Sequence, residues 1–259
     1  MIHIECHCHG RLRELLPQGQ RGCRRLKLKQ RLTLYELLAM LRIPHPEVDL
    51  ALCNGESVDL QQRIGDRDRL HLYPSACGMV ESRPLQRLRT RPLRLPRFIL
   101  DVHLARLARR MRLLGLDCWY QPGTADDEII RLALAQRRTI LTRDRGLLHQ
   151  PAVQHGYYVR AIEPSRQLQE VLSRFDLYPQ LAPFSRCTLC NGMIEAVDKE
   201  RVRDQVKPQV YRLFEEFFRC GRCGQVYWQG SHYERMLRDL QPWLVPEFSG
   251  RSDGPGAVN

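Results

Sequence analysis

The chain has 259 residues, of which 43% are hydrophobic, so it is long and apolar enough to form two or three compact domains. No apolar run approaches the roughly 20 residues of a membrane-crossing helix, and the N-terminus lacks the pattern of a secretory signal. A cytoplasmic protein without a membrane partner is therefore expected. The 41 Lys and Arg against 29 Asp and Glu give a net charge of +12, which favours an anionic partner, nucleic acid ahead of a membrane surface.

Residues 1–80 have the pattern of a small α+β domain. The alternation in MIHIECHC predicts a strand, and Thr33 precedes the periodic run LYELLAMLRI, which predicts a helix. Two strands joined by a turn are expected in VDLALCNGESVDL, and a last strand in RDRLHLYP. This order resembles a ubiquitin-like fold, and LCNGESVDLQQRIGDRDRLHLYP is similar to the sulfur carriers of thiamine and molybdopterin synthesis. Those carriers need a free terminal Gly-Gly, whereas here Cys77-Gly78 is followed by more protein, so sulfur carriage is not expected. A protein partner for the ubiquitin-like module is expected instead.

The first predicted strand carries two cysteines and two histidines that invite a metal hypothesis. Alternate residues of a strand point to opposite faces, so Cys6 and Cys8 share one side while His7 and His9 share the other. Only two of the four side chains can then ligate one ion. Ordinary strand positions are favoured over a metal site here.

Residues 81–96 contain three prolines and no usable period, which predicts a linker. The positive charge of the chain is densest here. Two interpretations stay open, a solvated tether and a strap that contacts phosphates. The arginines concerned are Arg83, Arg87, Arg89, Arg91 and Arg94.

Residues 97–182 predict alternating strands and helices. RFIL, LDCWY, TILT and GYYVRAI are expected as strands, with helices in VHLARLARRMRLLG, in DDEIIRLALAQR, briefly after Asp144 and in SRQLQEVLSRF. This alternation is typical of a parallel sheet with covering helices, that is, an α/β domain.

Residues 183–245 hold two CxxC pairs that predict a metal site. Each pair can direct two sulfurs at one ion, and a glycine follows each pair within two positions, which leaves room for backbone amides near the thiolates. Four thiolates close a tetrahedral site with no place for water, so one structural zinc ion is expected. Its ligands are Cys187, Cys190, Cys220 and Cys223. Residues 246–259 are expected to form a disordered tail.

Three acids follow predicted strands in the middle domain. Asp101 comes directly after RFIL, Asp144 lies two residues beyond TILT, and Asp126 opens the helix after the second strand. Because the carboxyl ends of parallel strands share one edge of a sheet, the three carboxylates are expected to lie together. Clustered carboxylates repel one another unless a cation lies among them, and their hard oxygens suit Mg²⁺ or Mn²⁺. Such a site performs metal-assisted phosphodiester hydrolysis.

Helix capping is the alternative role for each acid, because Asp is a preferred N-cap. Thr124 with Asp127 resembles a capping box, which would assign Asp127 to the helix start and leave Asp126 as the metal ligand. Three further residues could contact RNA phosphates, although packing or solvation is the commoner role of each. They are His103, Arg143 and Arg145. Four aromatic residues after the second CxxC could stack on bases, although core filling is favoured. They are Tyr227, Trp228, His232 and Tyr233.

Several segments together resemble a known family. RFILDVHLARLARRMRLLGLDCWY, DDEIIRLALAQRRTILTRDRGLL, SRCTLCNG and FRCGRCGQVYWQGSHYERM are similar to the mut-seven C-terminal RNase family over residues 97–240. The resemblance implies a PIN-like nuclease domain fused to a zinc ribbon, and a Mg²⁺- or Mn²⁺-dependent ribonuclease that uses Asp101, Asp126 and Asp144. The rival hypothesis is a non-catalytic RNA-binding or adaptor protein in which the acids serve only as caps.

Overall fold

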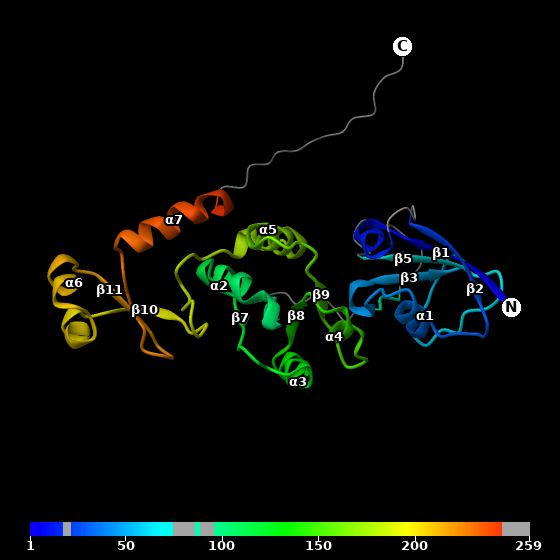
Figure 1. Cartoon of the computed structure of the whole chain (residues 1–259), viewed down its shortest axis with the longest axis horizontal. Helices are drawn as coiled ribbons and strands as arrows, with labels where there is room; N and C mark the ends of the chain where they lie inside the picture. The colour runs from blue at the N-terminus through cyan, green and yellow to red at the C-terminus, as the bar shows by residue number, and fades with distance from the viewer. Residues whose placement is uncertain (18–21, 75–85, 89–95, 245–259) are drawn as a thin grey trace, which may run out of the picture. The chain divides into compact units, whose positions relative to one another are not determined.

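The structure is a computed structural model, and it describes residues 1–17, 22–74, 86–88 and 96–244 (Figure 1). The chain divides into two compact units. One unit comprises Met1–Ala108 and Asp117–Gln167, and the other comprises Arg109–Leu116 and Leu168–Asn259. None of the helices in the described part of the chain is long and apolar enough to cross a membrane.

The first sheet has the strand order β2-β1-β5-β3-β4. Its strands are β1 (Ile2–Cys8), β2 (Cys23–Leu28), β3 (Leu50–Cys53), β4 (Glu56–Ser57) and β5 (Arg69–Tyr73). The central strands β1 and β5 are parallel, and the other neighbours are antiparallel. This arrangement is the expected ubiquitin-like α+β domain.

Helix α1 (Leu34–Met40) packs into the core of this domain. The Thr33 hydroxyl accepts a hydrogen bond from the Glu36 N–H at 3.2 Å, and the Glu36 carboxylate accepts one from the Thr33 N–H at 2.7 Å. This capping box satisfies free N–H groups of the first turn. Leu34, Leu37 and Leu38 are buried, as are Cys6 and Cys8 of β1. The two cysteines are therefore core residues, as their strand positions indicated.

The second sheet is fully parallel, with the order β7-β6-β8-β9. Its strands are β6 (Arg97–Leu100), β7 (Cys118–Trp119), β8 (Arg138–Thr142) and β9 (Gly156–Tyr158). Helices α3 (Asp126–Gln136) and α4 (Arg145–His149) pack on it, with α3 beside β8 (Figure 1). All five residues of β8 are buried, as expected for a parallel strand covered on both faces. The predicted α/β fold class is confirmed.

A short 3-10 helix of the ubiquitin-like domain, η2 (His45–Glu47), contacts β9 and α4 of the parallel-sheet domain. Glu47 is only 2% exposed, and its carboxylate accepts hydrogen bonds from the Tyr158 N–H at 2.7 Å and from Arg160 Nη2 at 2.7 Å. The Tyr35 hydroxyl donates to the carbonyl of His149 at 2.6 Å. The ubiquitin-like domain therefore packs against β9 and α4.

The basic linker lies mostly outside the described residues, and with it Arg83, Arg89, Arg91 and Arg94. Residues 86–88 are described. Arg87 Nη1 lies 3.6 Å from Asp49 Oδ2, and the Leu88 N–H donates to the Asp49 carbonyl at 2.8 Å. Arg87 is thus paired with an acid of the ubiquitin-like domain.

Two helices run from one unit into the other. They are α2 (Ala105–Leu113), which follows the 3-10 helix η3 (Val102–Leu104), and α5 (Pro164–Phe175). The predicted end of α2 is confirmed, because Gly115 adopts a φ of +84° that favours glycine.

The second unit contains an antiparallel sheet of β10 (Ile194–Val197), β11 (Phe217–Cys220) and β12 (Val226–Trp228). Its hydrophobic core consists of Val202, Phe217 and Val226, with Trp228 and Phe214 partly buried against them. The same unit also contains four helical segments: η4 (Tyr178–Gln180), η5 (Lys199–Gln205), α6 (Pro208–Leu213) and α7 (Ser231–Leu244). Residues 246–259, expected as a tail, lie outside the described part.

Candidate active site and metal centre

Asp101 lies at the carboxyl end of β6 and is 4% exposed. Its N–H donates to the Leu141 carbonyl of β8 at 3.2 Å, which holds the residue at the sheet edge. Its Oδ1 accepts the His103 N–H at 2.9 Å, and its Oδ2 accepts the Thr142 hydroxyl and the Arg143 N–H, the latter at 3.3 Å. Asp101 is thus both the cap of η3 and a buried carboxylate fixed by three donors.

Asp144 is exposed and caps α4, because its Oδ1 accepts the Gly146 N–H at 2.6 Å. Its own N–H donates to the Thr142 hydroxyl at 2.8 Å. Thr142 is fully buried, and its hydroxyl contacts Asp101 as well as Asp144. Thr142 was not among the predicted site residues, although it ends β8 two residues before Asp144.

Asp126 is exposed and stands at the first position of α3. Partial desolvation of this exposed carboxyl and the negative charges of Asp144, Asp101 and Asp127, in that order, raise the pKa of Asp126 above its ordinary value. The charges of the two other strand-end acids therefore act on this carboxyl.

The predicted capping box at the start of α3 is wrong. The N-cap is Ala125, no side chain caps the helix, and the Thr124 hydroxyl instead donates to the Gln121 carbonyl at 2.9 Å. The Thr124 hydroxyl bonds within the turn before α3, because the Gln121 carbonyl lies within reach three residues earlier. Asp127 is exposed in the first helical turn, where an acid is favourable without being a cap.

Two of the three residues proposed to contact RNA are engaged within the protein. Arg143 Nη1 donates to three carbonyl groups after β9, those of Val159 at 3.4 Å, Arg160 at 3.0 Å and Ala161. Arg145 Nη1 donates to the Leu15 carbonyl at 3.4 Å, and its guanidinium lies 4.8 Å from the Tyr158 ring centroid. His103 is exposed. The three carbonyls after β9 hold one nitrogen of the Arg143 guanidinium within the fold, and a phosphate contact by Arg143 stays a prediction.

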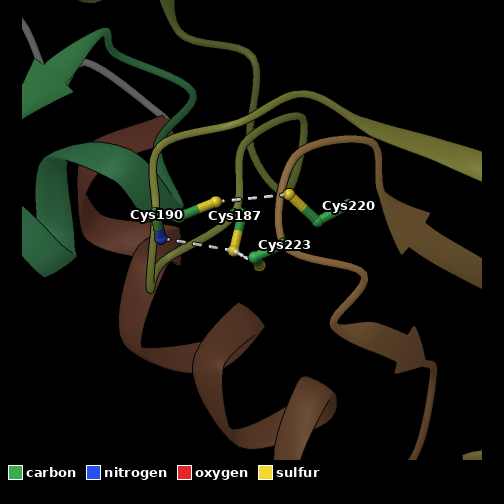
Figure 2. Close-up of side chains that lie close together, drawn as sticks. All are labelled: Cys187, Cys190, Cys220 and Cys223. Atoms are coloured by element: carbon green, nitrogen blue, oxygen red, sulfur yellow. Dashed lines mark hydrogen bonds between the residues drawn. The ribbon is translucent and has the colours of Figure 1, made fainter.

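The four cysteines of the second unit converge on one point. Their sulfur atoms all lie within 4.8 Å of one another, and Figure 2 shows them directed toward one another from two turns. Sγ of Cys187 is 3.6 Å from that of Cys223, and Sγ of Cys190 is 3.4 Å from that of Cys220. Sulfurs bound to one zinc ion at 2.3 Å in a tetrahedron lie about 3.8 Å apart, so the arrangement fits a metal ion.

Within the described ranges, this cluster is the one group of three or more His, Cys, Asp or Glu that could hold a metal ion. The three aspartates do not form such a group. Their carboxylates are coupled electrostatically without being packed around a common point.

The glycines near the cysteines have different roles. A Cβ on Gly192 would lie 2.8 Å from Cys220 Sγ and 2.7 Å from Arg222 Cβ, so Gly192 is needed for the close approach of the two turns. Gly224 has open space around it but a φ of +76°, so it is favoured by backbone conformation. Glycine was expected in both turns because it leaves room near the sulfurs, and the structure requires that room at Gly192 only.

The surroundings of Cys187 favour ionisation of its thiol. Burial opposes ionisation, but hydrogen bonds from the Tyr227 hydroxyl at 3.0 Å and from the N–H groups of Cys190 and Leu189 outweigh it and lower the pKa of Cys187 to about 7. A thiolate is the form that binds a metal. Tyr227 is therefore a hydrogen-bond neighbour of the cysteine cluster. Its sequence context had suggested only core packing or base stacking.

His7 and His9 lie on the face of β1 opposite its buried cysteines. The His7 and His71 rings stack with centroids 4.6 Å apart, and His9 stacks on Tyr73 at 4.2 Å. These contacts account for both histidines as part of a ring ladder across β1 and β5.

Two family models match the chain. Residues 96–240 match the model described as the Mut7-C RNAse domain, and residues 1–79 match the model described as Mut7-C ubiquitin. The comparisons with curated proteins and with solved structures give no match. The predicted family and its N-terminal ubiquitin-like module are confirmed.

Proposed function

We propose that this chain, which belongs to the Mut7-C RNase domain family, cleaves RNA phosphodiester bonds with a divalent metal ion at Asp101, Asp126 and Asp144. One observation carries the proposal. Asp101 and Asp144 follow adjacent parallel strands at the sheet edge where α/β domains bind ligands, and their charges raise the pKa of Asp126 at the start of α3.

The donor chemistry suits Mg²⁺ or Mn²⁺. These ions prefer oxygen ligands, and Mg²⁺ commonly keeps several waters while it binds one or two carboxylates and a substrate phosphate. Since the three carboxylates do not meet at one point, an ion held by one or two of them would keep water ligands. Its positive charge would offset the repulsion that raises the pKa of Asp126.

The protein's own contribution is to hold carboxylates in place before RNA binds. Thr142 fixes Asp101 through its hydroxyl and positions the backbone of Asp144 with the same oxygen. Asp126 stands at a helix start and is exposed, so it can reach an ion or a water. A bound ion would activate a water for attack and offset the charge that develops on the phosphate.

The four cysteines are proposed to hold one structural zinc ion. Four sulfur ligands leave no open position, so this ion would stabilise the ribbon and take no part in cleavage. Two metals with separate roles follow, one soft-ligand structural site and one hard-ligand reactive site.

The test is cleavage of a mixed RNA pool by the full chain with Mg²⁺, with Mn²⁺ and with no added divalent ion. EDTA is avoided, because it would also remove a structural zinc. Asn at position 101, 126 or 144 keeps the shape and most of the capping ability of Asp while removing one charge. Each variant is expected to stay folded and to lose about 100-fold or more in rate.

Asp127→Asn is the matched control, since Asp127 is an exposed acid in the same helical turn as Asp126, and a much smaller loss is expected. The alternative is an RNA-binding protein whose acids only cap helices. The caps that Asp101 and Asp144 form favour that alternative. It would replace the nuclease if wild type cuts no RNA with either ion, or if the three Asn variants cut as fast as wild type.

A further inference from the structure

A pocket of about 500 Å³ lies beside the cysteine cluster in the second unit. Its walls come from three places: the three-stranded sheet, the segment that carries the first cysteine pair, and the helices α2 and α7. The volume is within the range of sites that bind small ligands or single groups of larger ones.

The register of the sheet directs aromatic rings into this pocket. Phe217 pairs with Trp228 on the face that packs into the hydrophobic core. The next pair, Phe218 with Tyr227, therefore points to the opposite face, and both residues line the pocket. Val226 and Trp228, which contact the core on the first face, border the pocket as well, so its sheet wall is largely aromatic.

Two more rings line the pocket from outside the sheet. Phe184 and Tyr233 lie with centroids 4.4 Å apart, and both are only partly buried. Phe184 has a φ of +62°, a conformation that is uncommon for a bulky residue, and its N–H donates to the Leu113 carbonyl at 2.9 Å. The fold retains an aromatic ring at a backbone position that does not favour one.

The charged side chains that line the pocket are basic. They are Arg109 and Arg186, and none of the described lining residues is Asp or Glu. Arg186 is held in place by the carbonyls of Gly115 and Asn191 at 3.1 and 3.0 Å, whereas Arg109 is exposed. A ligand with a flat apolar ring and a negative charge matches both features.

We propose that this pocket binds an unstacked base of single-stranded RNA together with its phosphate. A base stacks on aromatic side chains through its π face, and an arginine beside them pairs with the phosphate. The choice of RNA as the polymer rests on the proposed function, but the pocket is separate from the three acids of the candidate reactive site.

The test measures the affinity of the full chain carrying Asp144→Asn, so that RNA is not consumed, for a fluorescein-labelled single-stranded RNA of about ten nucleotides. Tyr233→Leu keeps an apolar side chain but removes the ring, and it is expected to weaken RNA binding about tenfold. Tyr233→Phe keeps the ring and is expected to bind RNA as wild type does. Arg109→Gln is expected to reduce the salt dependence by about one phosphate contact. A blunt duplex of the same sequence should bind all variants alike, because its bases are not free to enter a pocket.

Tyr211→Leu is the matched control, since Tyr211 is a half-buried tyrosine of the same unit outside the pocket. Equal binding by Tyr233→Leu and wild type would overturn the proposal. So would an equal loss in Tyr211→Leu, or displacement of the RNA by an acidic peptide of the same charge as readily as by unlabelled RNA. Cleavage is not read in this experiment. If the nuclease proposal is wrong, the affinity for RNA can still depend on the Tyr233 ring. If the pocket does not bind RNA, cleavage can still depend on a metal ion.

Discussion

At Asp126 the requirements of stability and of the proposed function are opposed. Its pKa is raised in the folded protein by partial desolvation and by three neighbouring negative charges. A carboxyl with a higher pKa in the folded than in the unfolded state binds more protons when folded. Its ionisation therefore lowers the free energy of unfolding as the pH rises from about 4, near the unfolded pKa, through the folded pKa.

Asp126→Asn is therefore expected to raise the melting temperature at pH 7 without divalent ions and to flatten the fall in stability above about pH 4. Mn²⁺ should stabilise wild type but not this variant, since binding to the folded state alone adds stability. Thermal unfolding followed by circular dichroism across pH measures both effects. A lower melting temperature for Asp126→Asn without metal would contradict the electrostatic argument.

At the scale of residues, topology alone brought the three acids to one sheet edge, because each follows a strand that the apolar runs identified. The partners of their neighbours could not be predicted. Arg143 binds carbonyls of a segment 16 to 18 residues away, and Thr142 bridges Asp101 and Asp144 only because β6 and β8 are adjacent. Such contacts depend on strand order, which local sequence does not specify.

At the scale of elements, the three-stranded sheet of the second unit is expected to depend on a metal ion held by its two cysteine turns. Its hydrophobic core contains few buried side chains, so a bound zinc ion would supply much of its folding free energy. Cys187→Ser and Cys220→Ser are expected to lose zinc and to become sensitive to protease over residues 183–244. Metal content and limited proteolysis of the purified chain measure this. Cys23→Ser is the control, since Cys23 is exposed and outside the cluster. A metal-free wild type with the same protease resistance would exclude the structural role.

The elements themselves were predicted well where periodicity was strong. The strands RFIL and TILT and the helix after Thr33 were found with their ends close to those of β6, β8 and α1. The cap of α3 was predicted wrongly. Thr124 and Asp127 have the spacing of a capping box, but the Thr124 hydroxyl donates to the Gln121 carbonyl of the preceding turn instead.

At the scale of the whole molecule, the described contacts of the ubiquitin-like domain include a buried ion pair with the parallel-sheet domain. Glu47 and Arg160 are 113 residues apart, so no sequence pattern indicated their pairing. An external protein partner for the module stays a prediction.

Glu47→Ala would leave Arg160 partly buried without this partner and remove the acceptor of the Tyr158 N–H. It is expected to lower the free energy of unfolding by about 3–5 kcal/mol, as for other broken buried pairs. Glu14→Ala is the matched control, because Glu14 also pairs with Arg160 but is 56% exposed, and its loss should cost about 1 kcal/mol or less. Urea unfolding of the full chain measures both, and equal costs would show that Glu47 does not join the two domains.

The measurement that tests the account most directly compares Mn²⁺ binding with RNA cleavage in the same protein. Bound Mn²⁺ is followed by electron paramagnetic resonance and the initial cleavage rate by gel, for wild type and Asp126→Asn over one range of Mn²⁺ concentration. The account predicts that the cleavage rate and the amount of bound Mn²⁺ rise together in wild type. Asp126→Asn is expected to need more Mn²⁺ for binding and for cleavage, and its maximal rate should be lower by a factor of about 100 or more. A cleavage rate that is already full without divalent ions, or one that Asp126→Asn leaves unchanged, would contradict it.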